Sequence, residues 1–85
     1  TESLMWLSFS GGGTIQGIAD VGAMGIAAST VIGNPQFVAT PDSSGFTSLQ
    51  LPTSMGVQQY DFYLASPSYA FIGTLAPTYG RLDQQ

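Results

Sequence analysis

The segment 57–75 constrains the fold more than any other part of the chain. Its sequence, VQQYDFYLASPSYAFIGTL, holds two runs of alternating aromatic, aliphatic and β-branched residues around a Ser-Pro-Ser break. Such residues fit a pleated sheet, and a break of this length can join the two strands of a hairpin. Pro67 belongs to the turn, because it cannot donate a hydrogen bond to a strand ladder. We therefore expect a β-hairpin over 57–75.

The alternation within this hairpin also assigns side chains to faces. We expect Phe62 and Phe71 in the core, and Asp61, on the face opposite Phe62, at the solvent or at a junction between elements. Both faces of the hairpin carry apolar side chains, and strands of that kind are usually covered on both sides. A chain of 85 residues has little material for that cover.

Turn signals divide much of the remaining chain into short strands. We expect strands at 4–10, 36–40 and 46–51, because each is a short run rich in apolar residues that is followed by Gly or Pro. The turn signals recur at the spacing of an all-β sandwich. The glycines at 11–13 indicate a flexible turn, because a phosphate-binding loop needs a further glycine pattern or a lysine.

The Gly/Ala-rich segment 15–32 leaves two structures open. Its larger apolar residues recur at helical spacing, but each of its interior glycines costs a helix about 1 kcal/mol relative to alanine. The alternative is a pair of short strands broken near 22–25. A membrane-spanning helix needs about 20 largely apolar residues, whereas Gln16 and Asp20 interrupt this run. The predicted fold is thus mainly β, with short antiparallel strands and a segment 15–32 that is helical or irregular.

Charged residues make up only 7% of the chain, against about 25% in an ordinary soluble domain. A small domain has proportionally more surface and should need more charge. Three environments suit such a neutral surface: a large protein assembly, a membrane or an extracellular layer. We expect a single domain over 1–85, extended within an assembly or closed on itself, with a polar tail at 78–85 that is frayed or reaches a neighbour.

The rarest residue types exclude several functions. The sequence contains no Cys and no His, and Arg81 is its single basic residue. Disulfides are therefore impossible within the chain, and the usual ligands of structural zinc are missing. Nucleic-acid binding needs clustered Lys and Arg, and a net charge of −4 repels a polyanion. We expect no cofactor, no bound metal and no nucleic-acid partner.

The catalytic inventory is limited to carboxylates, tyrosines and hydroxyls. No spacing brings two carboxylates together for acid–base chemistry. Asp42 belongs to a turn, PDSSG, that has too few oxygen ligands for calcium. Thr1, exposed by loss of an initiator methionine or by proteolysis, could act as an N-terminal nucleophile, but Arg81 is its only candidate cationic partner. We expect no enzymatic activity and no catalytic residues.

Four aromatic residues are candidates for an interface: Trp6, Tyr63, Tyr69 and Tyr79. Trp and Tyr are enriched at interfaces because their rings combine an apolar body with a polar group. Such a set could line a face that binds a sugar, a peptide or another protein chain.

These features favour a non-enzymatic structural protein of a large assembly, with many copies of the chain as partners. A virion component, such as a minor capsid protein, a cement protein or a capsid-derived fragment, fits best, which places the chain in a virion or outside the cell. One alternative is a small secreted β-sandwich that binds a glycan or a surface protein. A further alternative is a membrane-active peptide centred on 15–33.

If the assembly hypothesis is right, the isolated chain should aggregate or fold poorly in dilute buffer, because its uncharged surface keeps molecules apart weakly. Thermal unfolding measured over a series of concentrations checks this expectation. A sharp two-state transition of a monomer, independent of concentration, would contradict it.

Overall fold

The computed structural model describes residues 4–10, 12–19, 25–30, 34–52, 59–65, 70–76 and 79–83. Within them the chain forms eight β-strands: β1 (Leu4–Ser10), β2 (Thr14–Ala19), β3 (Ile26–Ser29), β4 (Phe37–Ala39), β5 (Phe46–Gln50), β6 (Tyr60–Leu64), β7 (Phe71–Leu75) and β8 (Gly80–Asp83). The mainly β class expected from the sequence is confirmed, and the described residues form no helix.

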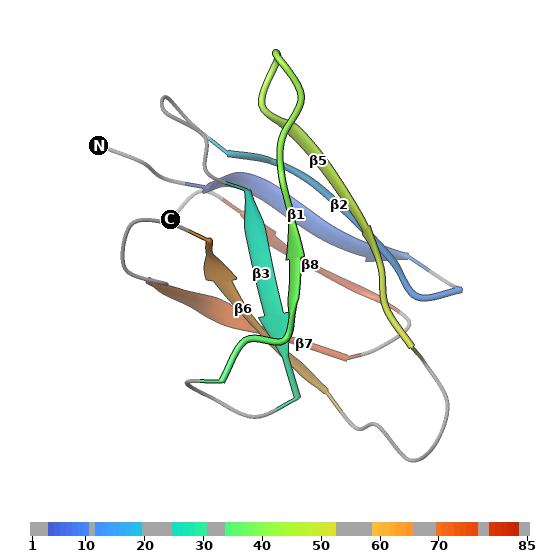
Figure 1. Ribbon diagram of the computed structural model, residues 1–85. Coiled ribbons are helices and arrows are strands. Elements are labelled where there is room, and N and C mark those ends of the chain that lie inside the picture. The colour runs from blue at the N-terminus through green and yellow to red at the C-terminus, as the bar shows by residue number, and fades with distance from the viewer. Residues whose placement is uncertain are drawn as a thin grey trace.

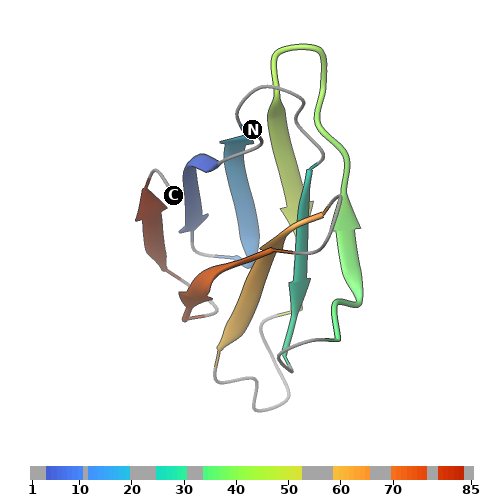
Figure 2. The same ribbon diagram turned by 90° about the vertical axis from the view of Figure 1, so that its left-hand side faces the viewer.

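The strands form two antiparallel four-stranded sheets that face each other (Figures 1 and 2). Sheet A has the order β5-β2-β1-β8, and sheet B has the order β4-β3-β6-β7. The two sheets approach each other along both sides, where β4 lies near β5 and β7 lies near β8. A two-layer sandwich is the expected solution for strands that are each apolar on one face.

The connectivity of β1–β7 is that of an immunoglobulin-like sandwich. In such sandwiches strands A, B and E share one sheet, while G, F, C and C′ share the other. Taking β1, β2 and β5 as A, B and E, and β7, β6, β3 and β4 as G, F, C and C′, reproduces both strand orders. Strand β8 extends sheet A beyond β1. This architecture carries many unrelated functions, so it does not by itself indicate one.

The hairpin expected over 57–75 is present as β6 and β7, which pair antiparallel. One expectation about it is wrong: Phe71 is 52% exposed and is not a core residue. The register shifts between Phe62, which faces Gly73, and Tyr63, which faces Phe71. Ile72 is therefore the extra residue of a β-bulge. Because a bulge reverses the alternation, Ile72 turns inward and Phe71 turns outward.

Strand β6 is buried along its whole length. Phe62 is fully buried, as expected, but Asp61 is also buried, at 1% exposure, so it does not face the solvent. The double-sided cover expected for this hairpin is thus present for its first strand, and it arises within a single chain. β3, the neighbour of β6, is likewise buried at every position.

Most described residues of the segment 15–32 lie in strands. It contributes most of β2 and all of β3, and residues 20–24 between them lie outside the described residues. The two-strand alternative is therefore correct and the helical alternative is wrong for the described positions. Residues 80–83, expected to belong to a polar tail, form β8 and pair with β1. The side chain of Leu82 on β8 packs against the core and lies close to Gly73.

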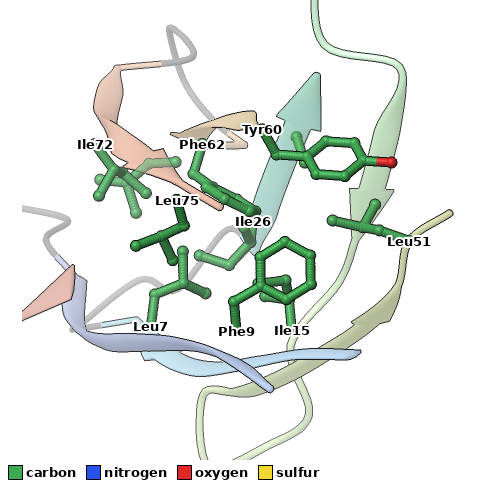
Figure 3. Packing of buried hydrophobic residues seen from close by; sticks show 11 residues of the cluster. Leu7, Phe9, Ile15, Ile26, Leu51, Tyr60, Phe62, Ile72 and Leu75 are labelled. Carbon is green, nitrogen blue, oxygen red and sulfur yellow. The ribbon is translucent and has the colours of Figure 1, made fainter. Parts of the chain in front are cut away.

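The core fills the space between the sheets (Figure 3). Its buried members are Leu7, Phe9, Ile15, Ile26, Ala28, Leu51, Tyr60, Phe62, Leu64, Ile72 and Leu75. Phe9 reaches from sheet A to two rings of sheet B, and its centroid lies 6.0 Å from that of Tyr60 and 6.1 Å from that of Phe62. Such tilted and perpendicular ring contacts add to the free energy of burial.

Tyr60 links the core to the connection between β5 and β6. Its ring is buried, and its hydroxyl donates a hydrogen bond to the carbonyl oxygen of Pro52. A tyrosine at the start of strand F that bonds backward to the E–F connection is the tyrosine corner of immunoglobulin-like sandwiches. Burial raises the pKa of the Tyr60 phenol above its ordinary value of 10.0, because the charged form loses hydration.

Gly25 marks a close approach that a substitution would disrupt. Gly25 and Gly12 both have positive φ, of 92° and 87°, but a Cβ on Gly25 would collide with the carbonyl oxygen of Ala39, whereas nothing lies within 4 Å of one on Gly12. We expect Gly12→Ala to lower the free energy of unfolding by about 1 kcal/mol through backbone strain alone. Gly25→Ala should cost at least about twice as much.

Urea denaturation of the two variants measures this difference. Because Gly12→Ala carries the same type of backbone strain without the collision, it is the matched control. Equal losses in the two variants would show that β3 and β4 do not approach each other as described.

Candidate interaction surfaces

The carboxylates of the described residues lie apart from one another. Asp42 is in the turn before β5, Asp61 is on β6 in sheet B, and Asp83 is on β8 in sheet A. Glu2, Asp20 and the candidate nucleophile Thr1 lie outside the described residues. Within the described ranges no three acidic side chains gather where they could hold a metal ion. Each described carboxylate therefore belongs to its own turn or strand and not to a shared site.

Asp42 organises the turn that leads into β5. Its Oδ1 accepts hydrogen bonds from the Ser44 hydroxyl at 2.7 Å, the Ser44 N–H at 2.8 Å and the Phe46 N–H at 3.0 Å. These bonds to the charged form, that of the Ser44 hydroxyl first, lower the pKa of Asp42 from its ordinary value of 3.8. Asp42 therefore acts as a turn residue, as its PDSSG context predicts.

Asp61 has a partner on the neighbouring strand. Asp61 on β6 is paired with Thr74 on β7, and the Thr74 hydroxyl donates a hydrogen bond of 2.9 Å to Asp61 Oδ1. A buried carboxylate needs such donors, because its transfer from water is otherwise costly. Asp61 alternates with the inward-facing Tyr60 and Phe62, so it lies on the outer face of sheet B.

The four interface candidates do not form one cluster. Trp6 is half-buried on β1 in sheet A, and Tyr79, 69% exposed, immediately precedes β8 of the same sheet. Tyr63 lies on β6 in sheet B and is only 3% exposed, so the isolated chain offers little of it to a partner. Tyr69 lies outside the described residues. Trp6 is thus the one described candidate within a strand of sheet A, while Tyr79 lies between β7 and β8 and forms an isolated bridge with Ala76.

The outer face of sheet B carries an apolar row across all four strands. Cross-strand pairing places Val38, Ala27, Tyr63 and Phe71 side by side. The central pair is buried, whereas Val38 and Phe71 at the two edges are each 52% exposed. The rings of Tyr63 and Phe71 meet edge to face, with centroids 5.5 Å apart. Val38 and Phe71 were not candidates from the sequence. Alternation alone does not show which face of a short strand is exposed, and the isolated Gly73 was the one signal of a bulge beside Phe71.

The outer face of sheet A carries one polar row and, beside it, a row that is mostly apolar. Pairing places Arg81, Ser8, Gln16 and Ser48 in one row across its four strands. The neighbouring row runs from Asp83 through Trp6 and Ile18 to Phe46, and its last three side chains are apolar and half-buried. The guanidinium carbon of Arg81 lies 5.2 Å from the centroid of the Trp6 ring, and Arg81 Nε donates to Asp83 Oδ1 at 2.7 Å. The single cation of the chain thus sits beside its single tryptophan.

Comparisons with known proteins give this chain no relative. No family model, curated protein or solved structure matches it. Among the described residues, no helix has the length and apolar character needed to cross a membrane. The function therefore has to be argued from the surfaces of the sandwich.

The turn formed by Asp42 makes the free energy of unfolding depend on pH. A folded-state pKa below 3.8 means that the stabilisation is complete above 3.8 and is lost as the pH falls through the lowered value. Asp42→Asn keeps an acceptor oxygen but does not titrate. We expect its free energy of unfolding to fall less than that of the unmodified chain between neutral and strongly acidic pH.

Urea denaturation at the two pH values measures this dependence. Ser43→Ala is the control, because Ser43 lies in the same turn but its side chain donates none of the three bonds to Asp42. Equal acid sensitivity of Asp42→Asn and the unmodified chain would contradict the role of this carboxylate.

Proposed function

We propose that this chain is a non-enzymatic structural subunit of a larger protein assembly, in which other copies of the chain contact the edges of sheet B. One observation carries the proposal: both edge strands of sheet B are uncharged and present a large, half-exposed apolar side chain. Val38 on β4 and Phe71 on β7 are each 52% exposed. Exposed apolar groups of this size favour contact with another protein surface.

The edges of sheet B are only partly protected against pairing, because β4 is short and β7 begins at a bulge but neither strand carries a charge. Edge strands expose unpaired N–H and C=O groups, and soluble proteins commonly guard them with charges, prolines or bulges. β4 reads FVA and β7 reads FIGTL, without a charge or a proline. The bulge at Ile72 protects only the start of β7, and its pairing from Gly73 to Leu75 is regular. In sheet A the edge strand β8 carries Arg81 and Asp83, whereas the other edge strand, β5, is uncharged but polar.

The distribution of charge also permits copies to approach along these edges. The chain carries a net charge of −4, so copies repel one another wherever their carboxylates meet. Of the described carboxylates, Asp61 is buried, Asp42 lies in a turn and Asp83 is paired with Arg81. None of these is an exposed charge on β4 or β7. Contact along β4 and β7 themselves therefore brings no exposed carboxylate of these two strands together.

The size of the chain supports several simultaneous neighbours. A protein interface of standard size takes about 800 Å² from each partner, which is roughly a fifth of the 4486 Å² of surface that this chain exposes. Contacts at both edges of sheet B would cover a large share of a surface with little charge. We propose a particle outside the cell, such as a virion with this chain as a minor capsid or cement protein, as the assembly.

Replacing Phe71 should weaken self-association. We expect Phe71→Ser to raise the dissociation constant between copies about tenfold, because the apolar surface of one half-exposed ring is lost from each contact. Sedimentation over a concentration series measures this constant. Val38→Ser tests the opposite edge in the same way.

Tyr79→Ser is the matched control, since it removes an aromatic side chain that is more exposed than Phe71 and that lies outside the named strands, beyond the opposite end of β7. It should leave self-association unchanged. A chain that stays monomeric at the highest concentration reached, or a Tyr79→Ser variant as impaired as Phe71→Ser, would overturn the proposal.

A further inference from the structure

Strand β8 is attached to the sandwich by few groups. It pairs with β1 and with no other described strand, and Figure 2 shows it at one side of sheet A. Of its side chains, that of Leu82 packs against the core, while Arg81 and Asp83 are exposed. The strand can therefore leave β1 without removing a fully buried side chain from between the sheets.

The place that β8 occupies fits its sequence closely. Leu82 lies against Gly73 of β7, where an added Cβ would lie 3.0 Å from two carbons of the Leu82 side chain. Gly80 lies against Leu75, whose Cδ2 would be 2.9 Å from a Cβ at position 80. A leucine thus meets a glycine at both positions. This place accepts an extended segment with the spacing of Gly80 and Leu82, and the β8 of any other copy is such a segment.

The two charges of β8 are paired with each other. Arg81 Nε donates to Asp83 Oδ1 at 2.7 Å, and both residues belong to β8, so the ion pair moves with the strand. Because both side chains are more than half exposed, the strand can enter water at little electrostatic cost. The contact of Arg81 with Trp6 is lost on departure and can form again with the Trp6 of a second copy.

The connection from β7 to β8 is short. Ala76 and Tyr79 form an isolated antiparallel bridge, so the chain turns back within a few residues as it passes from sheet B to sheet A. Short connections of this kind invite the exchange of a terminal element between copies, because they leave the chain little freedom to turn back on itself. Exchange removes the need for this reversal and keeps both strands intact.

We propose that copies of the chain exchange β8, so that the strand of one copy pairs with β1 of another. Each copy then regains the pairing with β1 and the contact of Leu82 with Gly73. The closed and the exchanged forms differ in the connection 76–79 and in the association of two copies. A short connection holds its own strand at an effective concentration on the order of millimolar, so exchange competes at chain concentrations of that order. It goes beyond the contacts proposed for the edges of sheet B and does not depend on them.

The absence of cysteine from the chain allows a direct test by disulfide formation. Ser8 on β1 and Arg81 on β8 are cross-strand partners. The variants Ser8→Cys and Arg81→Cys are prepared separately, mixed at about 1 mM total chain, incubated and oxidised, and the products are identified by mass. We expect the mixed dimer to exceed either dimer of like chains at least about tenfold, because a disulfide needs Cα atoms within about 7 Å of each other.

Three further variants serve as controls. Ser48→Cys mixed with Arg81→Cys should give few mixed dimers, because Ser48 lies in the same outward row but on β5, at the opposite edge of sheet A. A chain that carries both Ser8→Cys and Arg81→Cys, oxidised while dilute, should hold β8 on its own β1 and give no linked dimer when it is concentrated. Phe71→Ser, added to both partners of the main experiment, should leave the yield of mixed dimer unchanged.

Three results would overturn the proposal. The first is a mixed dimer no more abundant than the dimers of like chains, which would show that β8 stays with its own chain. The second is a predominance of dimers linked through two Ser8→Cys chains, which would indicate that the outer faces of sheet A pack together. The third is a linkage through Ser48→Cys as efficient as that through Ser8→Cys, which would indicate unspecific contact.

The Phe71→Ser control separates this proposal from the proposed function. Mixed dimers that persist in its presence support exchange even if sedimentation finds no contact at the edges of sheet B. A self-association that Phe71→Ser weakens, without mixed dimers, would support those edges and rule out exchange.

Discussion

The structure depends on the burial of β6 from both sides. On the inner side Tyr60 and Phe62 meet Phe9 of the opposite sheet, and the Tyr60 hydroxyl fastens the connection from β5. On the outer side Asp61 is buried with a hydrogen bond from Thr74. The chain is short and has no disulfides, yet it forms a closed sandwich because β6 contributes apolar area to the core. The one carboxylate of this strand, Asp61, is buried with a hydrogen-bond donor.

Local patterns were sufficient for most of the fold. The hairpin 57–75 and the first strand follow from the alternation of apolar residues, and the turn at Asp42 follows from its side chain, which bonds the backbone two and four residues ahead. What alternation cannot show is an inserted residue. The bulge at Ile72 exchanges the two faces of β7, so Phe71 moves from the expected core to the surface. The isolated Gly73 in FIGTL is a possible sign of a bulge, but it does not fix where the extra residue lies.

The candidate surfaces were less accessible to sequence reasoning because they depend on long-range pairing. Trp6 and Tyr63 belong to the same class by composition, yet they lie on different sheets and only Trp6 has substantial exposure. The contact between Trp6 and Arg81 joins the two ends of the described chain and exists only because β8 pairs with β1. Residues 80–83 carry too few apolar side chains to predict a strand from the sequence alone. They form one because β1 supplies their pairing partner.

The pairing of β8 with β1 has a consequence for how the chain acquires its structure. The first and the last described strands are adjacent in sheet A, so this ladder closes the longest loop in the molecule. Long loops delay contact formation, because the entropy cost of closing the loop is incurred before strand pairing stabilises the chain. During synthesis, β1 must wait for β8 to emerge before its second edge is paired. The nascent sandwich therefore passes through a stage with an open flank beside Leu7 and Phe9, and a chaperone or a neighbouring chain could occupy that flank first.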